Sequence, residues 1–216
     1  MSTHILCLNI LILLVTLSPV MCAQTIMYII NKGVIDYSMD KFLKMLAVVL
    51  SIVIFLSAIF KIDLLIVELP KQSYWYLLGL VSVLVILIIE VLISYIIICL
   101  SGKSVSGITL ITTWKRSTIK VIGLSVIVAL LEEMIFRQIW FSILIKEFKI
   151  NAMIVIIITG FVYAMNHIFL GKKVLIQKFV SGIIYGCLFY FSGNCVIIPV
   201  IAHCVQNGVI LMKDRG

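Results

Sequence analysis

The chain has 216 residues, of which 63% are hydrophobic and only 12% charged, and its formal net charge is +8 at pH 7. A soluble globular domain carries about 25% charged residues, so this chain lacks the polar surface of a water-soluble protein. Its lysines and arginines cluster in short segments between apolar blocks, which indicates the topology signal of a membrane protein and argues against nucleic-acid binding.

The apolar blocks predict an all-α fold, a polytopic bundle of about seven transmembrane helices. Each block is about 20 residues long, which matches the hydrocarbon core of a bilayer at about 1.5 Å per helical residue. In chain order, the expected spans are 5–30, 42–60, 74–100, 119–145, 150–170, 174–191 and 195–212. We expect one membrane domain, in which N-terminal helices and an interfacial loop (1–118) precede a helical core (119–212).

The first span resembles a signal peptide at its end, near Pro19–Ala23, but no lysine or arginine occurs in residues 1–7. A signal peptide has a basic N-terminal region, so the sequence favours an uncleaved helix and leaves cleavage open. Most of the 17 lysines and arginines follow the odd-numbered spans. This distribution predicts an N-terminus outside and a C-terminus in the cytoplasm, with Trp114, Lys115 and Arg116 anchoring the cytoplasmic face. The abundance of isoleucine and lysine is typical of an AT-rich genome, such as that of a Gram-positive bacterium. It therefore favours a bacterial plasma membrane.

Ionisable groups inside a membrane cost a few kcal/mol each, so each one needs a partner or a function. The N-terminal half has only Glu90 at such a depth, and we expect it to be a buried partner of a cation or a contact with water. The polar groups of the C-terminal half are Glu132, Glu133, Arg137, His167, His203 and Asn207. Gly182 and Gly186 form a small-xxx-small pair that would let another helix approach.

Helical spacing distinguishes the two neighbouring glutamates. A helix turns about 100° per residue, so Glu133 and Arg137 lie about 40° apart and can form an ion pair. Glu132 points about 140° away from Arg137 and stays free for chemistry. Counted along straight spans, His167 lies about 5 Å deep, His203 about 14 Å and Glu132 about 20 Å, so tilted or broken helices must bring them together.

Together these groups can hydrolyse a peptide. A carboxylate can act as a general base towards water, and an imidazole can orient that water. A second imidazole and an amide NH₂ can stabilise the oxyanion of the tetrahedral intermediate. The alternative for Asn207 is a hydrogen bond that joins two helices, and the spacing leaves both roles open.

Three motifs at these positions resemble those of the CPBP intramembrane proteases, which include CAAX prenyl endopeptidases and bacteriocin self-immunity (Abi) proteins. The motifs are Glu132-Glu133-x-x-x-Arg137, Tyr163-x-x-x-His167 and His203-x-x-x-Asn207. The family usually has phenylalanine where this chain has Tyr163. The resemblance covers about residues 119–210. It implies that the catalytic residues are Glu132, His167, His203 and Asn207, with Glu133 and Arg137 as support.

The resemblance implies an intramembrane endopeptidase that acts on a peptide or prenylated peptide beside membrane lipids, in bacteriocin self-immunity or peptide-signal maturation. Whether the site binds a metal ion stays open. Zn²⁺ could be bound by Glu132, His167 and His203, but the chain has no His-Glu-x-x-His motif and a metal-free glutamate mechanism uses the same groups. The alternative from another class is a non-catalytic membrane immunity or binding protein.

Overall fold

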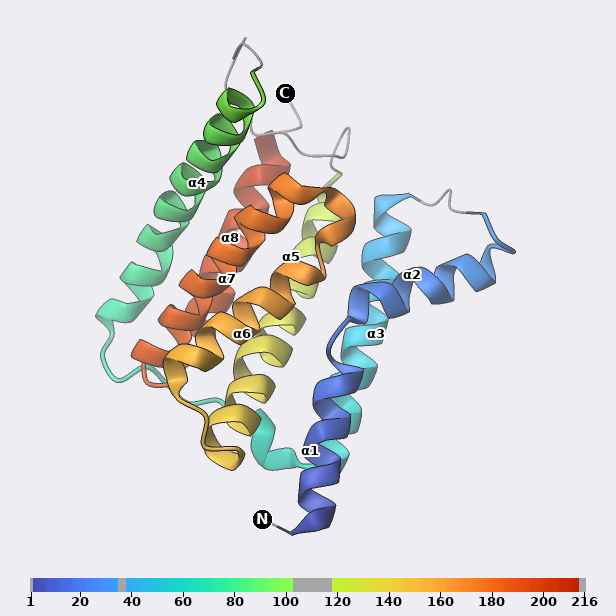
Figure 1. Ribbon diagram of the computed structural model, residues 1–216, viewed down its shortest axis with the longest axis vertical. Helices are drawn as coiled ribbons and strands as arrows, with labels where there is room; N and C mark the ends of the chain where they lie inside the picture. Colours follow the sequence, from blue (N-terminus) through green and yellow to red (C-terminus); the bar gives the residue numbers. More distant parts are fainter. Residues whose placement is uncertain (1, 35–37, 103–117, 214–216) are drawn as a thin grey trace.

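The computed structural model describes residues 2–34, 38–102 and 118–213, and within these ranges the chain is helical and contains no strand. The all-α prediction is therefore confirmed for this part of the chain. The α-helices are α1 (Thr3–Val15), α2 (Pro19–Ile30), α3 (Met39–Phe60), α4 (Tyr74–Leu100), α5 (Ile119–Glu133), α6 (Ala152–Met165), α7 (Lys172–Phe191) and α8 (Ile197–Lys213) (Figure 1). Residues 103–117, with the predicted anchor Trp114–Arg116 and most of the predicted interfacial loop, lie outside the described residues.

Every predicted span maps to helix, but length and hydropathy support fewer crossings than seven. Helices α3, α4 and α7 are long and apolar enough to cross a membrane, and the pair α1 and α2 adds a fourth crossing if it is one span. Within the described chain, α6 and α8 are apolar but shorter. The apolar helices make this an integral membrane protein, while the number of seven crossings stays a prediction.

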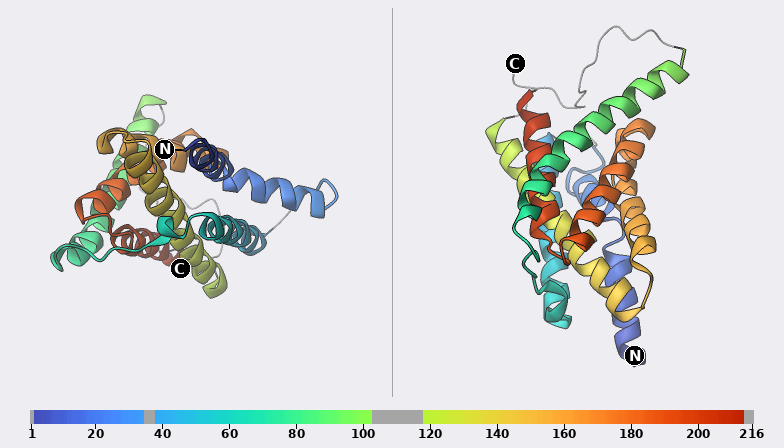
Figure 2. Two further views of the ribbon diagram at one scale, coloured as in Figure 1. Left: turned by 90° about the horizontal axis from the view of Figure 1, so that it is seen from below. Right: turned by 90° about the vertical axis from the view of Figure 1, so that its left-hand side faces the viewer.

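Apolar side chains cover the outside of the bundle, where lipid would lie. Helix α4 runs obliquely across α7 and α8 (Figure 2) and exposes large apolar residues on its other side. Examples are Leu77, Leu84 and Ile88. Water would penalise such a surface, whereas hydrocarbon does not. The polar side chain Glu90 instead lies on the buried face of α4, turned towards the bundle.

The first predicted span, 5–30, is not one straight helix, because α1 and α2 meet at a bend of 61°. Pro19 begins α2, where its missing N–H costs nothing, whereas in the interior of a continuous helix it would break a hydrogen bond. The Asn166 side chain holds the bend. Its Oδ1 accepts from the Val20 N–H at 3.4 Å, and its Nδ2 donates to the Leu17 carbonyl at 3.1 Å. The N-terminal helices are thereby attached to the residue that precedes His167.

The helix that contains the first motif continues beyond Glu133. It passes directly into a π-helical segment, Met134–Ile139, and then into a second one, Ser142–Glu147. The predicted span 119–145 is therefore one helical run. π-Helical turns are rare overall but occur often at functional sites. Their position directly after Glu132 and Glu133 therefore indicates a functional site in this region.

Helices α6 and α7 approach each other through glycine. A Cβ atom at Gly182 would lie 2.9 Å from the Cα of Gly160 and 3.1 Å from its carbonyl oxygen. Gly186 faces Ile156 of α6, where a Cβ would meet the side chain at 3.3 Å. The predicted small-xxx-small pair therefore does bring a second helix close, and that helix is α6.

Replacing Gly182 with alanine is expected to destabilise the protein by about 1–3 kcal/mol, because the added carbon meets backbone that cannot move aside. Gly123→Ala is the matched control, since no described heavy atom lies within 4 Å of a Cβ there. Unfolding of both variants in detergent, followed by far-UV circular dichroism, measures the difference. Equal stability of the two variants would show that the close approach does not constrain α6 and α7.

Candidate active site

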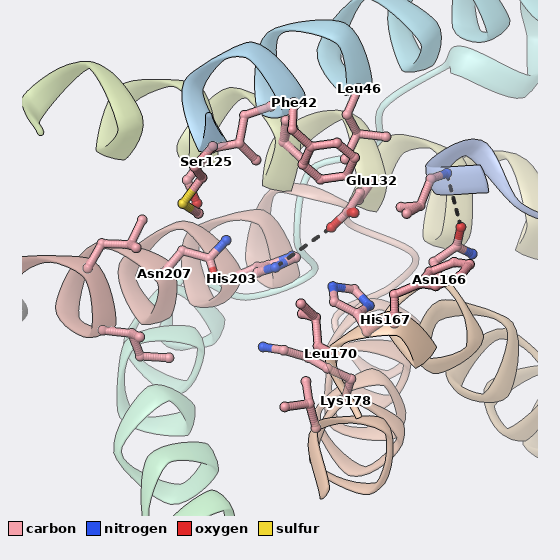
Figure 3. Close-up of a pocket in the computed structure, with 18 of the residues that line it drawn as sticks. Phe42, Leu46, Ser125, Glu132, Asn166, His167, Leu170, Lys178, His203 and Asn207 are labelled. Atoms are coloured by element: carbon pink, nitrogen blue, oxygen red, sulfur yellow. Dashed lines mark hydrogen bonds and ion pairs between the residues drawn. The ribbon is translucent and has the colours of Figure 1, made fainter. Parts of the chain in front are cut away.

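The four residues predicted to be catalytic line one cavity of about 290 Å³. Figure 3 shows them facing this space from three parts of the fold. They are Glu132 near the end of α5, His167 in the turn after α6, and His203 and Asn207 on α8. The predicted difference in depth does not separate them, because α5 runs obliquely to α8 (Figure 2) and His203 Nε2 lies 3.9 Å from Glu132 Oε2.

The two neighbouring glutamates lie in different surroundings. Glu133 is fully buried, with Oε2 3.1 Å from Arg137 Nε and Oε1 3.0 Å from His203 Nδ1. The ion pair expected from the spacing therefore forms. Glu132 borders the cavity instead, and its contact with His203 is longer than a hydrogen bond. One carboxylate is held by Arg137 and His203, while the other faces the cavity.

Arg137 joins the first motif to α7. Its side chain is fully buried, and Nη2 donates a hydrogen bond to the Gly182 carbonyl at 3.3 Å. The guanidinium also lies over the rings of Tyr163 and Tyr185, 5.4 and 5.8 Å from their centroids, within the range of cation–π attraction. These contacts hold the end of α5 against α6 and α7, so Arg137 positions the two glutamates.

The His203 ring has a protein partner at each nitrogen. A carboxylate only accepts hydrogen bonds, so the contact of Nδ1 with Glu133 places a hydrogen on Nδ1. In the neutral ring, Nε2 then accepts a hydrogen bond from the Tyr163 hydroxyl, which lies 3.2 Å away. Tyr185 stacks on the ring with centroids 5.0 Å apart. Neutral His203 is thus fixed in orientation and has no N–H left for the cavity.

His167 and Asn207 offer hydrogen-bonding groups that their protein neighbours leave free. His167 Nδ1 donates to the Tyr163 carbonyl at 3.0 Å, since a carbonyl can only accept. The neutral ring therefore keeps Nε2 as an acceptor. Asn207 lines the cavity, and its amide has no hydrogen bond with any other residue in the described part of the chain. A hydrogen bond to a neighbouring helix, the alternative role for Asn207, is not formed there.

The donor set gives no support for zinc. Across the described ranges, no three histidine, cysteine, aspartate or glutamate side chains are grouped so that they could hold a metal ion. Both ring nitrogens of His203 have protein partners, so a bond to Zn²⁺ would cost one of those contacts. We therefore derive no step through a metal.

The first half of the chain forms part of the cavity wall, which the motifs alone did not predict. The wall from α2, α3 and α4 includes Gln24, Phe42, Leu46 and Glu90. Lys178 on α7 also lines it. A sequence signal existed for Lys178, because it is a charged residue within the predicted span 174–191.

Glu90 has the cationic neighbour that was predicted for it, because Lys178 Nζ lies 3.7 Å from its Oε1. The same oxygen accepts hydrogen bonds from Gln206 Nε2 at 2.8 Å and Ser181 Oγ at 3.2 Å. Gln206 in turn accepts a hydrogen bond from the Tyr185 hydroxyl. This buried network links α4, α7 and α8 directly behind His203.

Comparison with known protein families gives a match for the second half of the chain. Residues 114–209 match the family described as "Type II CAAX prenyl endopeptidase Rce1-like". The matched range contains all three motifs, from Glu132 to Asn207. No curated protein and no solved structure matches the chain.

Proposed function

We propose, from the match of residues 114–209 to the Rce1-like family of type II CAAX prenyl endopeptidases, that the chain is an intramembrane endopeptidase whose catalytic base is Glu132. Its substrate would be a peptide or a lipidated peptide at the membrane. The observation that carries the proposal is that one cavity is shared by a carboxylate, an imidazole nitrogen and an amide, on Glu132, His167 and Asn207, and that none of the three has a hydrogen-bond partner among the described residues.

In the proposed first step, one water molecule donates one hydrogen bond to Glu132 and the other to His167 Nε2. Both groups are acceptors, so they hold both hydrogens and direct a lone pair of the water oxygen towards the scissile carbonyl carbon. The new C–O bond forms as the water proton moves to Glu132. Support comes from the tautomer of His167, whose Nδ1–H bond to the Tyr163 carbonyl leaves Nε2 as the acceptor.

The oxyanion that results needs donors, and we propose the Asn207 NH₂ group as one of them. His203 can be a second donor only as imidazolium, because its Nδ1–H is engaged by Glu133 and only a protonated Nε2 carries another hydrogen. Glu133 would balance that positive charge. The intermediate then collapses, the C–N bond breaks, and Glu132 returns its proton to the leaving amine.

Tyr163→Phe is expected to lower cleavage by no more than about ten-fold, since it removes one hydrogen bond to His203 worth about 0.5–1.5 kcal/mol. The protein level is expected to match that of the wild type, because the ring keeps its shape and phenylalanine is the usual residue of the resembling family. Cleavage rate per mole of folded protein is the measurement. A loss as large as that caused by removing Glu132 would make the hydroxyl itself part of the catalytic machinery.

We further propose a bacterial plasma membrane, with the N-terminus outside and the C-terminus cytoplasmic, as the lysine and arginine distribution supports. The process would be bacteriocin self-immunity or peptide-signal maturation, as the resemblance to Abi proteins implies. The activity test is wild-type protein, purified and reconstituted in liposomes, incubated with a peptide library whose products are identified by mass spectrometry. Protein-free liposomes are the control, and an absence of products would count against the protease.

A further inference from the structure

Lys178 is a partly buried lysine whose ammonium group has no hydrogen-bond acceptor among the described residues. Its side chain is 14% exposed and its nearest anionic atom, Glu90 Oε1, lies 3.7 Å away, beyond hydrogen-bond distance. Figure 3 shows the side chain pointing from α7 into the cavity that Glu132, His167 and His203 also face. A buried ammonium without an acceptor is costly unless another group, such as water or a ligand, completes its hydrogen bonds.

A second lysine of equal burial shows what a purely structural arrangement looks like in this fold. Lys61 is 15% exposed, and its Nζ donates to Glu147 Oε1 at 2.9 Å and to Asn9 Oδ1 at 3.1 Å. Lys61 is not among the residues that line the cavity. The two lysines therefore differ in what their ammonium groups can still bind. Lys178 lines the cavity with N–H groups that have no acceptor among the described residues, whereas Lys61 donates to two acceptors away from the cavity.

Glu90 does not depend on Lys178 for its hydrogen bonds. Gln206 and Ser181 already donate to Glu90 Oε1, at 2.8 and 3.2 Å. Glu90 and Glu132 place two carboxylates on the cavity wall, so an anionic ligand would be repelled there unless a cation faced it. Lys178 supplies that cation, and its donors are directed into the space where the substrate would lie.

We propose that Lys178 binds a carboxylate group of the substrate peptide. The inference rests on the proposed protease function, and it adds a specificity-determining residue to it. The carboxylate is either the C-terminus of the peptide or the side chain of an aspartate or glutamate near the scissile bond. A cavity of about 290 Å³ is at the small end for ligand sites, so it accommodates a short segment of peptide around the reacting bond.

The first arm of the test uses wild-type protein in liposomes and one cleavable peptide in four forms. These forms combine a free or amidated C-terminus with a glutamate or glutamine near the scissile bond. We expect one of the two carboxylates to raise kcat/KM by about ten-fold or more, as a charged hydrogen bond is worth about 1.5–3 kcal/mol. The form that responds identifies which carboxylate is bound. Equal kcat/KM values for all four forms would overturn the proposal, regardless of the kcat/KM values measured for any variant.

The second arm compares variants of α7 on the same peptides. Lys178→Gln is expected to bring the ratio of kcat/KM values for carboxylate and neutral peptides close to one, and Lys178→Arg to keep it. Lys172→Gln is the control, because Lys172 is exposed on the same helix and does not line the cavity. A folded Lys178→Gln variant that keeps the full preference would also overturn the proposal.

A binding experiment distinguishes failure of this proposal from failure of the proposed protease function. Affinity for the same four peptides is measured with Glu132→Gln protein, in which cleavage is expected to be blocked. A carboxylate preference in binding, with no cleavage by the wild type, would reject the protease and keep the carboxylate site. Cleavage by the wild type without a carboxylate preference would reject the carboxylate site and keep the protease.

Discussion

Glu132→Ala is expected to lower peptide cleavage by about 100- to 10,000-fold, the usual contribution of a general base, while the protein accumulates at its normal level. Glu132 borders the cavity and forms no ion pair with Arg137, so its removal leaves no buried charge without a partner. The measurement is the rate of product formation in liposomes, normalised to folded protein. Glu132→Gln should give the same loss with even less change in shape.

Glu133→Ala is the control for this experiment, because it removes the neighbouring carboxylate from a different environment. Glu133 contacts both Arg137 and His203, so its loss should reduce the amount of folded protein as well as activity. A Glu132→Ala protein that cleaves at the wild-type rate would contradict the assignment of the base. If that protein instead fails to cleave but still protects a sensitive host from bacteriocin, the non-catalytic immunity protein becomes the better account of protection.

Arg137→Ala is expected to destabilise the protein by about 3–5 kcal/mol, because breaking a buried ion pair leaves the remaining charge on Glu133 without its counterion. The side chain of Arg137 is fully buried, and it also donates to the Gly182 carbonyl on α7. Arg137→Lys should recover only part of the loss, since an ammonium cannot bond to Glu133 and Gly182 with the same planar geometry. Denaturant unfolding in detergent gives the free energies.

The surface pair of Lys120 with Asp40 is the matched control for Arg137. Its Nζ–Oδ2 distance of 2.7 Å is shorter than that of the buried pair, but the lysine side chain is 66% exposed. Lys120→Ala is therefore expected to destabilise the protein far less than Arg137→Ala does. Similar losses for Arg137→Ala and Lys120→Ala would mean that the buried pair is not what holds α5 against α7.

Helix positions could be predicted from the sequence because lipid leaves the backbone few choices. An apolar segment in a bilayer must satisfy its N–H and C=O groups internally, which a helix does from local residues alone. The pair of Glu133 with Arg137 was predictable for the same reason, since both residues lie on one helix. The family, too, could be recognised from short motifs within single spans. The bend at Pro19 was missed, although the proline itself was a local signal for it.

The tertiary structure alone decided what surrounds the motif residues. His203 contacts Glu133 on α5 and Tyr163 on α6, and these partners lie 70 and 40 residues away in the chain. The distances depend on how helices tilt and cross, which a hydrophobic period within one span does not record. The same reason hid the contact of Lys178 with Glu90, 3.7 Å across two helices. From the sequence alone came the fold class and the groups able to react. Which carboxylate faces the cavity, and which lysine lines it, came from helix packing.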